Sequence, residues 1–179
     1  MIKIILGILI AAIAGVLIYA ATRPDSFRVE RSIAIQSPPD KVFGLINDLA
    51  AWQAWSPYEA KDPNMKRTLG ATTRGQGAVY EWDGDRNVGQ GRMEIIESVP
   101  SSRIAIKLDF LKPFEAHNTA EFTLASPGDD TRVTWAIFGP MPFASKVMSL
   151  FFSMDQMIGK DFEVGLANLK ALAEKTTTP

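Results

Sequence analysis

The 179-residue sequence contains no cysteine and only one histidine, and its acidic and basic residues nearly balance. The absence of cysteine excludes disulfides and thiolate chemistry. A lone imidazole without cysteine argues against a zinc site, which usually needs several His or Cys ligands, so we expect no metal and no cofactor. A formal net charge of −1 and the lack of basic runs or RNA- and DNA-binding motifs argue against nucleic acid as a partner.

The sequence also lacks the motifs of common enzyme classes. It has no nucleophile elbow, phosphate-binding loop or dinucleotide fingerprint, and GQGAVYEWDG does not match GxGxxG. His117 is the obvious general base by residue type, but strand alternation places it on a polar face with Thr119 and Glu121. We therefore predict a surface position for His117 and assign no catalytic residue.

A long apolar run opens the chain. Residues 4–22 carry no charge and are rich in Ile, Leu, Ala and Val, and at about 1.5 Å per residue a helix of this length roughly spans the hydrocarbon layer of a membrane. We expect an uncleaved, single-pass membrane anchor over residues 1–23. A cleaved signal peptide is the alternative, although the leader has one lysine and YAATRP is a mediocre cleavage site. The flanking charges leave open which side of the membrane holds the rest of the chain.

Gly7, Ala11 and Gly15 are spaced by four residues and share one face of this predicted helix. Small residues at this spacing allow two membrane helices to approach closely, which would permit weak self-association. The preferred interpretation is simpler, because glycine and alanine are common in membrane helices.

Residues 24–179 predict a single α+β domain. Apolar residues alternate with a period of two, and turns rich in Pro, Gly and Asp separate the runs, which are FRVERSIAIQS, MKRTLG, GQGAVYEWDGD, GQGRMEIIESVP, SSRIAIKLDFLKP, FEAHNTAEFTLAS and DTRVTWAIFGP. After the first strand we expect two short helices that break at Asn47-Asp48. An apolar stripe predicts one long helix over residues 143–174. This helix is the only element large enough to cover the apolar face of an antiparallel sheet.

Four segments in this order resemble the START-like superfamily, also called the SRPBCC or polyketide cyclase/dehydrase-like family. They are SPPDKVFGLINDLAAWQAWSP, GQGAVYEWDGDRNVGQGRMEI, DDTRVTWAIFG and DFEVGLANLKALAE. The resemblance implies a helix-grip fold: a curved seven-stranded antiparallel sheet wraps around a long C-terminal helix and usually encloses a hydrophobic cavity. Members bind lipids, sterols or aromatic polyketides, and a few are enzymes, so the fold does not choose the function.

Eight aromatic or methionine side chains are candidates for lining such a cavity, because they lie on predicted inward faces or on the helices. They are Trp55, Tyr80, Trp82, Met93, Phe110, Phe122, Trp135 and Met154. A solid core would use the same residue types, so both interpretations stay open. Tyr80 stands out, because a buried hydroxyl requires a hydrogen-bonding partner.

The tryptophan pair Trp52 and Trp55, and the charged residue Arg31, each allow two interpretations. In NDLAAWQAWSP, Trp52 and Trp55 either pack a helix end on the sheet, with Pro57 forcing the chain out, or form an aromatic gate at a cavity mouth. Packing is favoured, and Trp55 is the tryptophan expected nearer to a ligand. Arg31 falls on the apolar face of the first strand; it either extends to solvent at the strand end, which is favoured, or faces an anionic ligand.

Three functional hypotheses follow. The first is a membrane-anchored binding module for a hydrophobic or amphipathic small molecule, lipid-like or aromatic. The second is a non-catalytic scaffold or stress-related interaction domain, which would have a solid core and an exposed apolar patch. The third and least favoured is a cyclase- or hydrolase-like enzyme, which would need a buried polar group with a perturbed pKa in the cavity, and Tyr80 is the first candidate.

Overall fold

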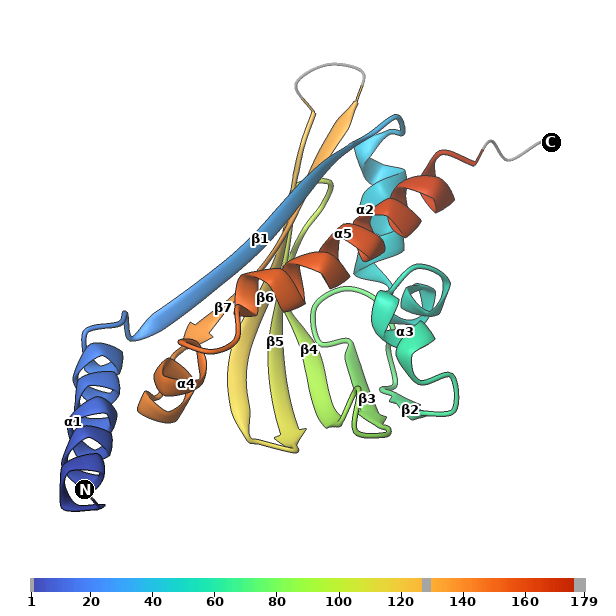
Figure 1. The fold of residues 1–179 in the computed structure, drawn as a ribbon. Coiled ribbons are helices and arrows are strands. Elements are labelled where there is room, and N and C mark those ends of the chain that lie inside the picture. Colours follow the sequence, from blue (N-terminus) through green and yellow to red (C-terminus); the bar gives the residue numbers. More distant parts are fainter. Residues whose placement is uncertain (1, 127–129, 176–179) are drawn as a thin grey trace.

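The computed structural model describes residues 2–126 and 130–175. In this part of the chain a curved seven-stranded sheet faces a helix near the C-terminal end (Figure 1). The elements are α1 (Ile2–Ala21), β1 (Ser26–Ile35), α2 (Pro39–Asn47), the 3-10 helix η1 (Leu49–Ala54), α3 (Pro57–Lys61), β2 (Lys66–Leu69), β3 (Val79–Asp83), β4 (Gln90–Val99), β5 (Arg103–Lys112), β6 (Ala116–Ala125), β7 (Thr131–Pro140), α4 (Phe143–Met148) and α5 (Met154–Ala173). Residue 1 of the expected anchor and residues 176–179 of the expected domain lie outside the described residues.

The sheet is antiparallel throughout, with the strand order β1-β7-β6-β5-β4-β3-β2. The first strand pairs with the last one over its whole length, from Ser26 opposite Pro140 to Ile35 opposite Thr131. Two register irregularities between β4 and β5, at Gln90/Gly91 and at Ile95/Glu97, add curvature, because a bulge bends a strand and increases its twist. The predicted helix-grip fold, a seven-stranded antiparallel sheet around a C-terminal helix, is confirmed.

The hydrophobic core fills one end of the space between the sheet and α5. Cross-strand pairing aligns Ile104 of β5, Phe122 of β6 and Trp135 of β7, and Leu166 of α5 is buried with them. None of the described residues of α1 belongs to this core, whose members run from Val29 to Ala173. The main hydrophobic cluster therefore forms without α1, although Ala20 near the end of α1 is buried.

The two short helices form where the sequence predicts them. Prolines occupy the first turn of α2, where a missing N–H costs no helical hydrogen bond. The side chain of Asp48 then accepts a hydrogen bond from the Ala50 amide at 3.1 Å and starts η1, which confirms the break at Asn47-Asp48. A third short helix, α3, was not predicted, although Ser56-Pro57 is a helix-start signal.

The expected single helix over residues 143–174 is wrong, because two helices occupy this range. The Ser149 hydroxyl donates to the Lys146 carbonyl at 2.7 Å after α4, and the Ser153 side chain accepts the Gln156 amide at 3.2 Å to begin α5. Serine side chains compete in this way with the helical backbone bonds. Phe151, which falls within the range of the expected helix, lies in the link between α4 and α5 and is exposed.

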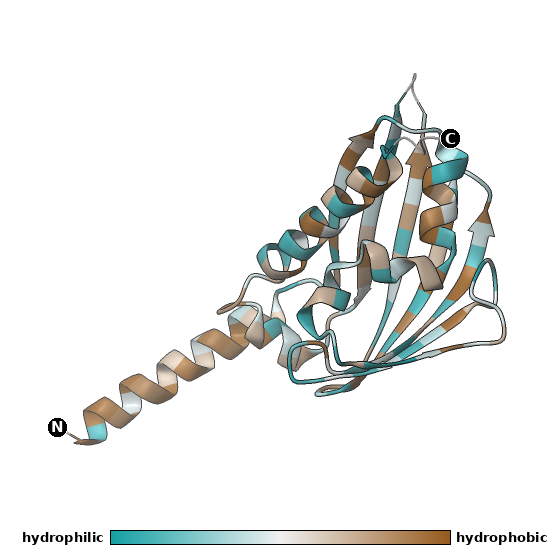
Figure 2. Ribbon diagram, turned by 90° about the vertical axis from the view of Figure 1, so that its right-hand side faces the viewer, coloured by the Kyte–Doolittle hydropathy of each residue, from teal (hydrophilic) through white to brown (hydrophobic). Residues whose placement is uncertain are grey.

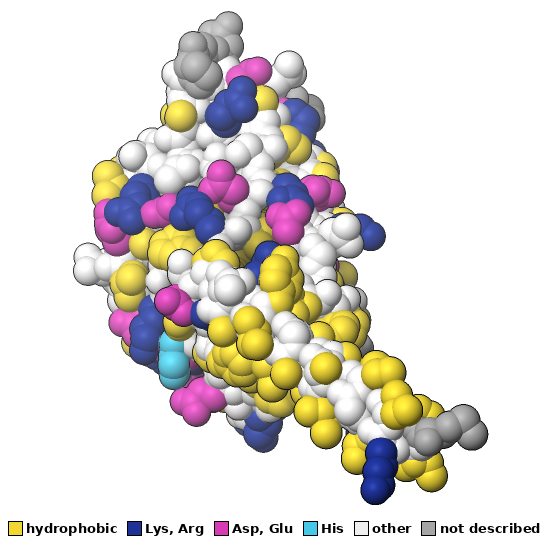
Figure 3. Space-filling view, turned by 60° about the vertical axis from the view of Figure 1, so that its left-hand side comes forward, with side chains coloured by type: hydrophobic (Ala, Val, Ile, Leu, Met, Phe, Trp, Pro, Cys, Tyr) yellow, Lys and Arg dark blue, Asp and Glu magenta, His cyan; other side chains and the backbone are white. Residues whose placement is uncertain are grey.

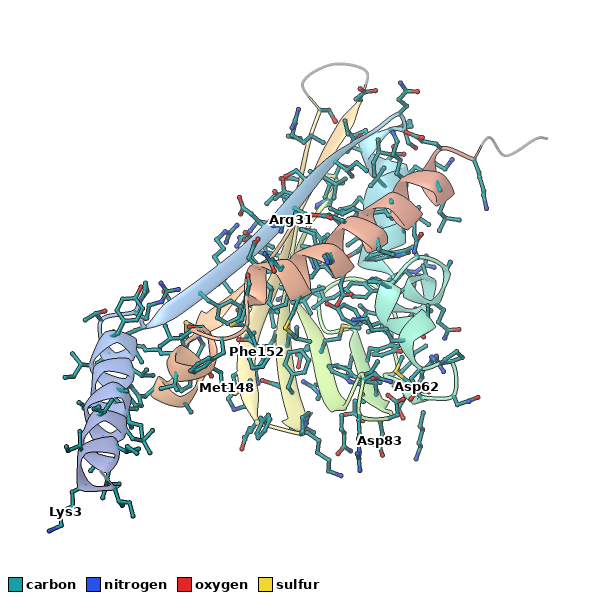
Figure 4. All side chains as sticks on the ribbon, in the orientation of Figure 1. Lys3, Arg31, Asp62, Asp83, Met148 and Phe152 are labelled. Carbon is teal, nitrogen blue, oxygen red and sulfur yellow. The ribbon has the colours of Figure 1, made fainter. Side chains whose placement is uncertain are left out.

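The apolar helix α1 projects from the domain (Figure 2). It is long and apolar enough to cross a membrane, a criterion that signal sequences also meet. Lys3 lies at its free end (Figure 4), and Gly7, Ala11 and Gly15 are all exposed. At its other end α1 contacts α4, and Lys146 of α4 forms an ion pair with Asp25 in the link to β1.

Arg31 connects β1 to α5 (Figure 4). Its guanidinium pairs with Asp155 at 2.9 Å and with Glu163 at 2.8 Å, and it lies against Gly159, where a side chain would collide with it. The favoured expectation for Arg31, a charge extended into solvent, is therefore corrected: the charge is neutralised by carboxylates of the facing helix.

Candidate ligand-binding cavity

A partly open cavity of about 460 Å³ lies between the concave face of the sheet and α5. It occupies the end of this space toward α4, away from the packed core. Strands β3 to β7 supply one wall, while Met154, Ile158 and Phe162 supply the helical wall. Its volume falls within the roughly 300–1,000 Å³ typical of small-molecule pockets, which are likewise lined mainly by apolar side chains.

Six of the eight candidate residues line this cavity, and two do not. The six are Tyr80, Trp82, Met93, Phe110, Trp135 and Met154. Trp55 and Phe122 are only 1% and 0% exposed and lie behind the cavity wall, in the packed core. Strand alternation thus identified the inward face of the sheet. It did not distinguish the inward side chains that line the cavity from those that belong to the packed core.

Trp52, rather than Trp55, borders the cavity. The residues belong to a 3-10 helix and its C-cap, where three residues complete a turn, so the two rings lie on one side with centroids 4.8 Å apart. The indole N–H of Trp52 donates to the Ile46 carbonyl at 2.8 Å, and that of Trp55 donates to Leu45 at 3.1 Å. Both tryptophans are therefore fixed to the end of α2.

Trp135 forms the boundary between the packed core and the cavity. Its ring stacks on Phe162 with centroids 4.0 Å apart and on Phe122 at 5.0 Å. Its buried indole N–H has no hydrogen-bond acceptor among the described residues. A buried donor without a partner costs about 1–3 kcal/mol, so this aromatic wall is held by stacking and burial alone.

The cavity has a polar end, built by Glu59 of α3 and Tyr80 of β3. The Tyr80 hydroxyl donates to Glu59 Oε1 at 2.5 Å, and Arg67 Nε donates to Glu59 Oε2 at 2.6 Å. Burial, and secondarily the bond to Glu59, raises the pKa of Tyr80 above its usual value near 10. Tyr80 is therefore protonated at neutral pH and acts as a donor.

Glu59 is the partner that a buried Tyr80 requires, and the sequence did not predict this contact. Nothing near residue 59 indicates that its carboxylate meets a strand residue 21 positions further on. The signal that could have found Glu59 is Ser56-Pro57, because a helix that begins there carries Glu59 in its first turn.

His117 lies at the rim of the cavity with an exposed side chain, as predicted. Its Nδ1 lies 2.7 Å from Asp109 Oδ1 on the neighbouring strand, and its Nε2 lies 3.3 Å from Glu115. The hydrogen bond to Asp109 raises the pKa of His117 above its usual value and outweighs the opposing effect of desolvation.

NMR titration of the single histidine tests this geometry. We expect the pKa of His117 to lie above about 6.5 and to fall toward it in Asp109→Asn. Glu115→Gln should lower the pKa less, because that contact is longer. Since the folded pKa is raised, the stabilisation from this pair is full below the unfolded pKa and is lost as the pH rises through the folded one. A pKa unchanged by Asp109→Asn would contradict the assignment.

These features define what the site can do. Among residues 2–126 and 130–175, no three His, Asp or Glu side chains converge to hold a metal ion. The cavity offers a large apolar wall, one carboxylate held by Tyr80 and Arg67, and a rim with His117. Such a site suits an apolar molecule that carries few polar groups.

Comparisons with solved structures agree with the fold. A protein of Thermobifida fusca is similar at 22% identity and a TM-score of 0.60, over 80% of this chain and 90% of that one. Ginseng major latex-like protein 151 from Panax ginseng is similar at 12% identity and a TM-score of 0.58, over 84% and 99%. The di-domain ARO/CYC StfQ from the steffimycin biosynthetic pathway is similar at 12% identity and a TM-score of 0.61, over 84% and 51%. Identities this low establish the fold alone.

No curated protein matches the sequence. A family model described as polyketide cyclase/dehydrase and lipid transport matches residues 26–174. This match spans every strand of the sheet as well as α4 and α5, and it agrees with the SRPBCC-type resemblance found in the sequence. The chain therefore belongs to the polyketide cyclase/dehydrase and lipid transport family.

Proposed function

We propose that the protein is a membrane-anchored module that binds a hydrophobic or amphipathic small molecule, lipid-like or aromatic, in the cavity between the sheet and α5. The observation that carries the proposal is the apolar, partly open cavity of about 460 Å³. A domain with a solid core, as the scaffold hypothesis requires, would leave no such space. The family's description, which includes lipid transport, supports the same ligand class.

The anchor in this proposal is residues 1–23, and the binding domain is residues 24–179. Support comes from the length and apolarity of α1 and from an apolar patch beside it. The apolar patch consists of exposed side chains on α4, on the link to α5 and on the first turn of α5: Phe143, Met148, Phe151, Phe152 and Met157. Figure 3 shows hydrophobic side chains of the domain next to those of α1. In Figure 4, Met148 at the end of α4 and Phe152 in the following link lie near each other.

The position of α4 relates this patch to the cavity. Pro142 and Ser145 line the cavity from the segment that begins α4, while Phe143 and Met148 of the same helix are exposed. Helix α4 therefore separates the cavity from the side on which α1 lies. A bilayer that holds α1 would cover the apolar patch and bring lipid close to the cavity wall, because exposed aromatic side chains partition into the interface.

We expect residues 24–179 to bind vesicles weakly through this patch alone. Replacing Phe151 and Phe152 by aspartate should weaken binding to phosphatidylcholine vesicles at least about tenfold, because each buried Phe contributes roughly 1.5–3 kcal/mol when fully transferred. Co-sedimentation with vesicles measures the change. As a matched control, Ile96→Asp with Val99→Asp removes two exposed apolar side chains of β4 and should leave binding unchanged. Equal losses in both double variants would contradict a role for the patch.

The ligand proposal is tested by native mass spectrometry of residues 24–179 purified without detergent, followed by organic extraction. We expect a reproducible excess mass that extracts as an apolar compound. A clean unliganded mass, together with no binding across a panel of lipids and aromatic compounds, would reject the carrier proposal and favour an interaction domain.

A second candidate, a cyclase- or hydrolase-like enzyme, is favoured by one observation. The cavity holds a carboxylate, Glu59, beside a tyrosine whose pKa is raised. Groups of this kind in a cavity are candidates for proton transfer. Conversion of the extracted compound into a product of different mass by the wild type, and not by Glu59→Gln, would support the enzyme; turnover by neither would support the carrier.

A further inference from the structure

The polar end of the cavity presents hydrogen-bond acceptors rather than donors to a ligand. We call Glu59, Arg67 and Tyr80 the polar pole. Glu59 and Tyr80 line the cavity, whereas Arg67 does not and contacts Glu59 from outside it. The Glu59 side chain is only 10% exposed. Because Glu59 lines the cavity, a ligand in the cavity would lie close to this carboxylate.

The hydrogens of the polar pole are directed to protein atoms. Tyr80 gives its hydroxyl hydrogen to Glu59, and Arg67 gives its Nε hydrogen to the same carboxylate. The other Arg67 nitrogens face backbone carbonyls, with Nη1 2.6 Å from Met65 O and Nη2 3.5 Å from Asp62 O. Lone pairs on Glu59 and Tyr80 are what the polar pole presents to the cavity.

The charges around the cavity also disfavour an anionic ligand group. The charged side chains in its described lining are Glu59, Glu115 and His117. His117 already pairs with Asp109 and Glu115 at the rim, so an anionic ligand group would find no free cation there. A second carboxylate placed beside Glu59 would be unfavourable, because Arg67, the cation of the polar pole, is already paired with Glu59 and does not line the cavity, and a charge removed from water needs a partner.

We propose that the polar pole selects ligands that end in a neutral hydrogen-bond donor, an alcohol or a phenol, and rejects those that end in a carboxylate. The inference rests on the proposed binding function and specifies its ligand class. A hydroxyl group at this position donates to Glu59 without adding charge, whereas a purely apolar ligand leaves unpartnered those Glu59 lone pairs that Tyr80 and Arg67 do not use. Sites that hydrogen-bond a substrate hydroxyl discriminate against analogues lacking it for this reason.

The test compares three ligands of similar shape: 2-naphthol, naphthalene and 2-naphthoate. At neutral pH the naphthol is uncharged, since phenols titrate near 10, and the naphthoate is ionised, since carboxyls titrate near 4. Isothermal titration uses the full-length chain in phosphatidylcholine nanodiscs, with empty nanodiscs subtracted. We expect 2-naphthol to bind at least about tenfold tighter than naphthalene, and 2-naphthoate to bind most weakly.

Glu59→Gln is the decisive variant. The amide keeps the shape of the carboxylate, removes its charge and adds donor hydrogens. The preference for 2-naphthol over 2-naphthoate should shrink at least about tenfold. Glu94→Gln is the matched control, because Glu94 lies on β4 with its carboxylate paired to Arg92 and is not among the cavity residues; it should leave all three affinities unchanged.

Tyr80→Phe provides a second variant in case Glu59→Gln fails to fold. It frees one lone pair of Glu59 for the ligand and leaves the bond from Arg67 intact, so 2-naphthol should gain affinity relative to naphthalene; a preference for 2-naphthol that falls instead would contradict the inference. Equal affinity of the wild type for 2-naphthol and 2-naphthoate, with naphthalene still bound, would overturn the inference and leave the binding function standing. Failure of all three ligands to bind would overturn both.

Discussion

Replacing Trp55 by alanine is expected to lower the free energy of unfolding of residues 24–179 by about 3–5 kcal/mol, the range for truncating large aromatic side chains in a core. Trp55 is 1% exposed and packs against Trp52, Phe122 and Trp135. Truncation would also leave the Leu45 carbonyl without its donor. Because domains typically have 5–15 kcal/mol of stability, this single change should remove a large part of it.

Guanidinium denaturation of the isolated domain measures this change, which is feasible because the core includes no described residue of α1. Trp55→Phe should cost less than Trp55→Ala, since a ring remains to fill the site. Trp82→Ala is the control: Trp82 is only partly buried and lines the cavity, so it should alter ligand binding with a smaller loss of stability. A Trp55→Ala domain as stable as the wild type would contradict the assignment of Trp55 to the packed core.

The strands and the inward face could be predicted because both follow from local alternation. A side chain at every second position points to the same face of a sheet, and cross-strand pairing then aligns inward residues of neighbouring strands. Ile95, Ile106, Ala120 and Ile137 form one such row across four strands. No long-range information was needed to place them on the concave face.

The types and boundaries of the helices were harder to predict, because they depend on individual side-chain hydrogen bonds. The sequence predicted a break at Asn47-Asp48, but it did not indicate that the next turn is a 3-10 helix, which brings Trp52 to the cavity and leaves Trp55 in the core. Likewise, Ser149 and Ser153 interrupt a stripe of apolar residues that otherwise reads as one helix. In each case local side-chain hydrogen bonds accompany the departure from the periodic pattern.

Which inward residues line the cavity could not be predicted. Alternation shows on which face of the sheet a side chain lies, but not whether other elements pack against it. Phe122 and Ala120 lie two residues apart on the same face of β6. The larger one is buried against Trp55 and Trp135, and the smaller one borders empty space. The difference depends on how α2, η1 and α5 fill the concavity, and Glu59 reaches the same space only because α3 packs there.

Ala120 therefore offers the sharpest test of the cavity itself. It lies on β6 between Ile106 and Ile137, and all three line the cavity. Ala120→Phe should weaken naphthalene binding at least about tenfold, or 1.4 kcal/mol, because the new ring occupies the floor of the site. The free energy of unfolding should change by no more than about 1 kcal/mol, since filling a void lacks the strain of overpacking a dense core.

Thr119→Phe is the matched control, because it places the same ring one residue away on the opposite face of β6. Naphthalene binding measured by isothermal titration should then match the wild type, and the contrast between the two variants isolates the cavity from any general effect of an added aromatic ring. Trp55→Ala and Ala120→Phe together separate the two parts of the concave face: the first should lose stability, the second should lose binding. If Ala120→Phe binds naphthalene as the wild type does, the ligand lies outside the space between the sheet and α5, and the exposed apolar patch on α4 becomes the site to examine.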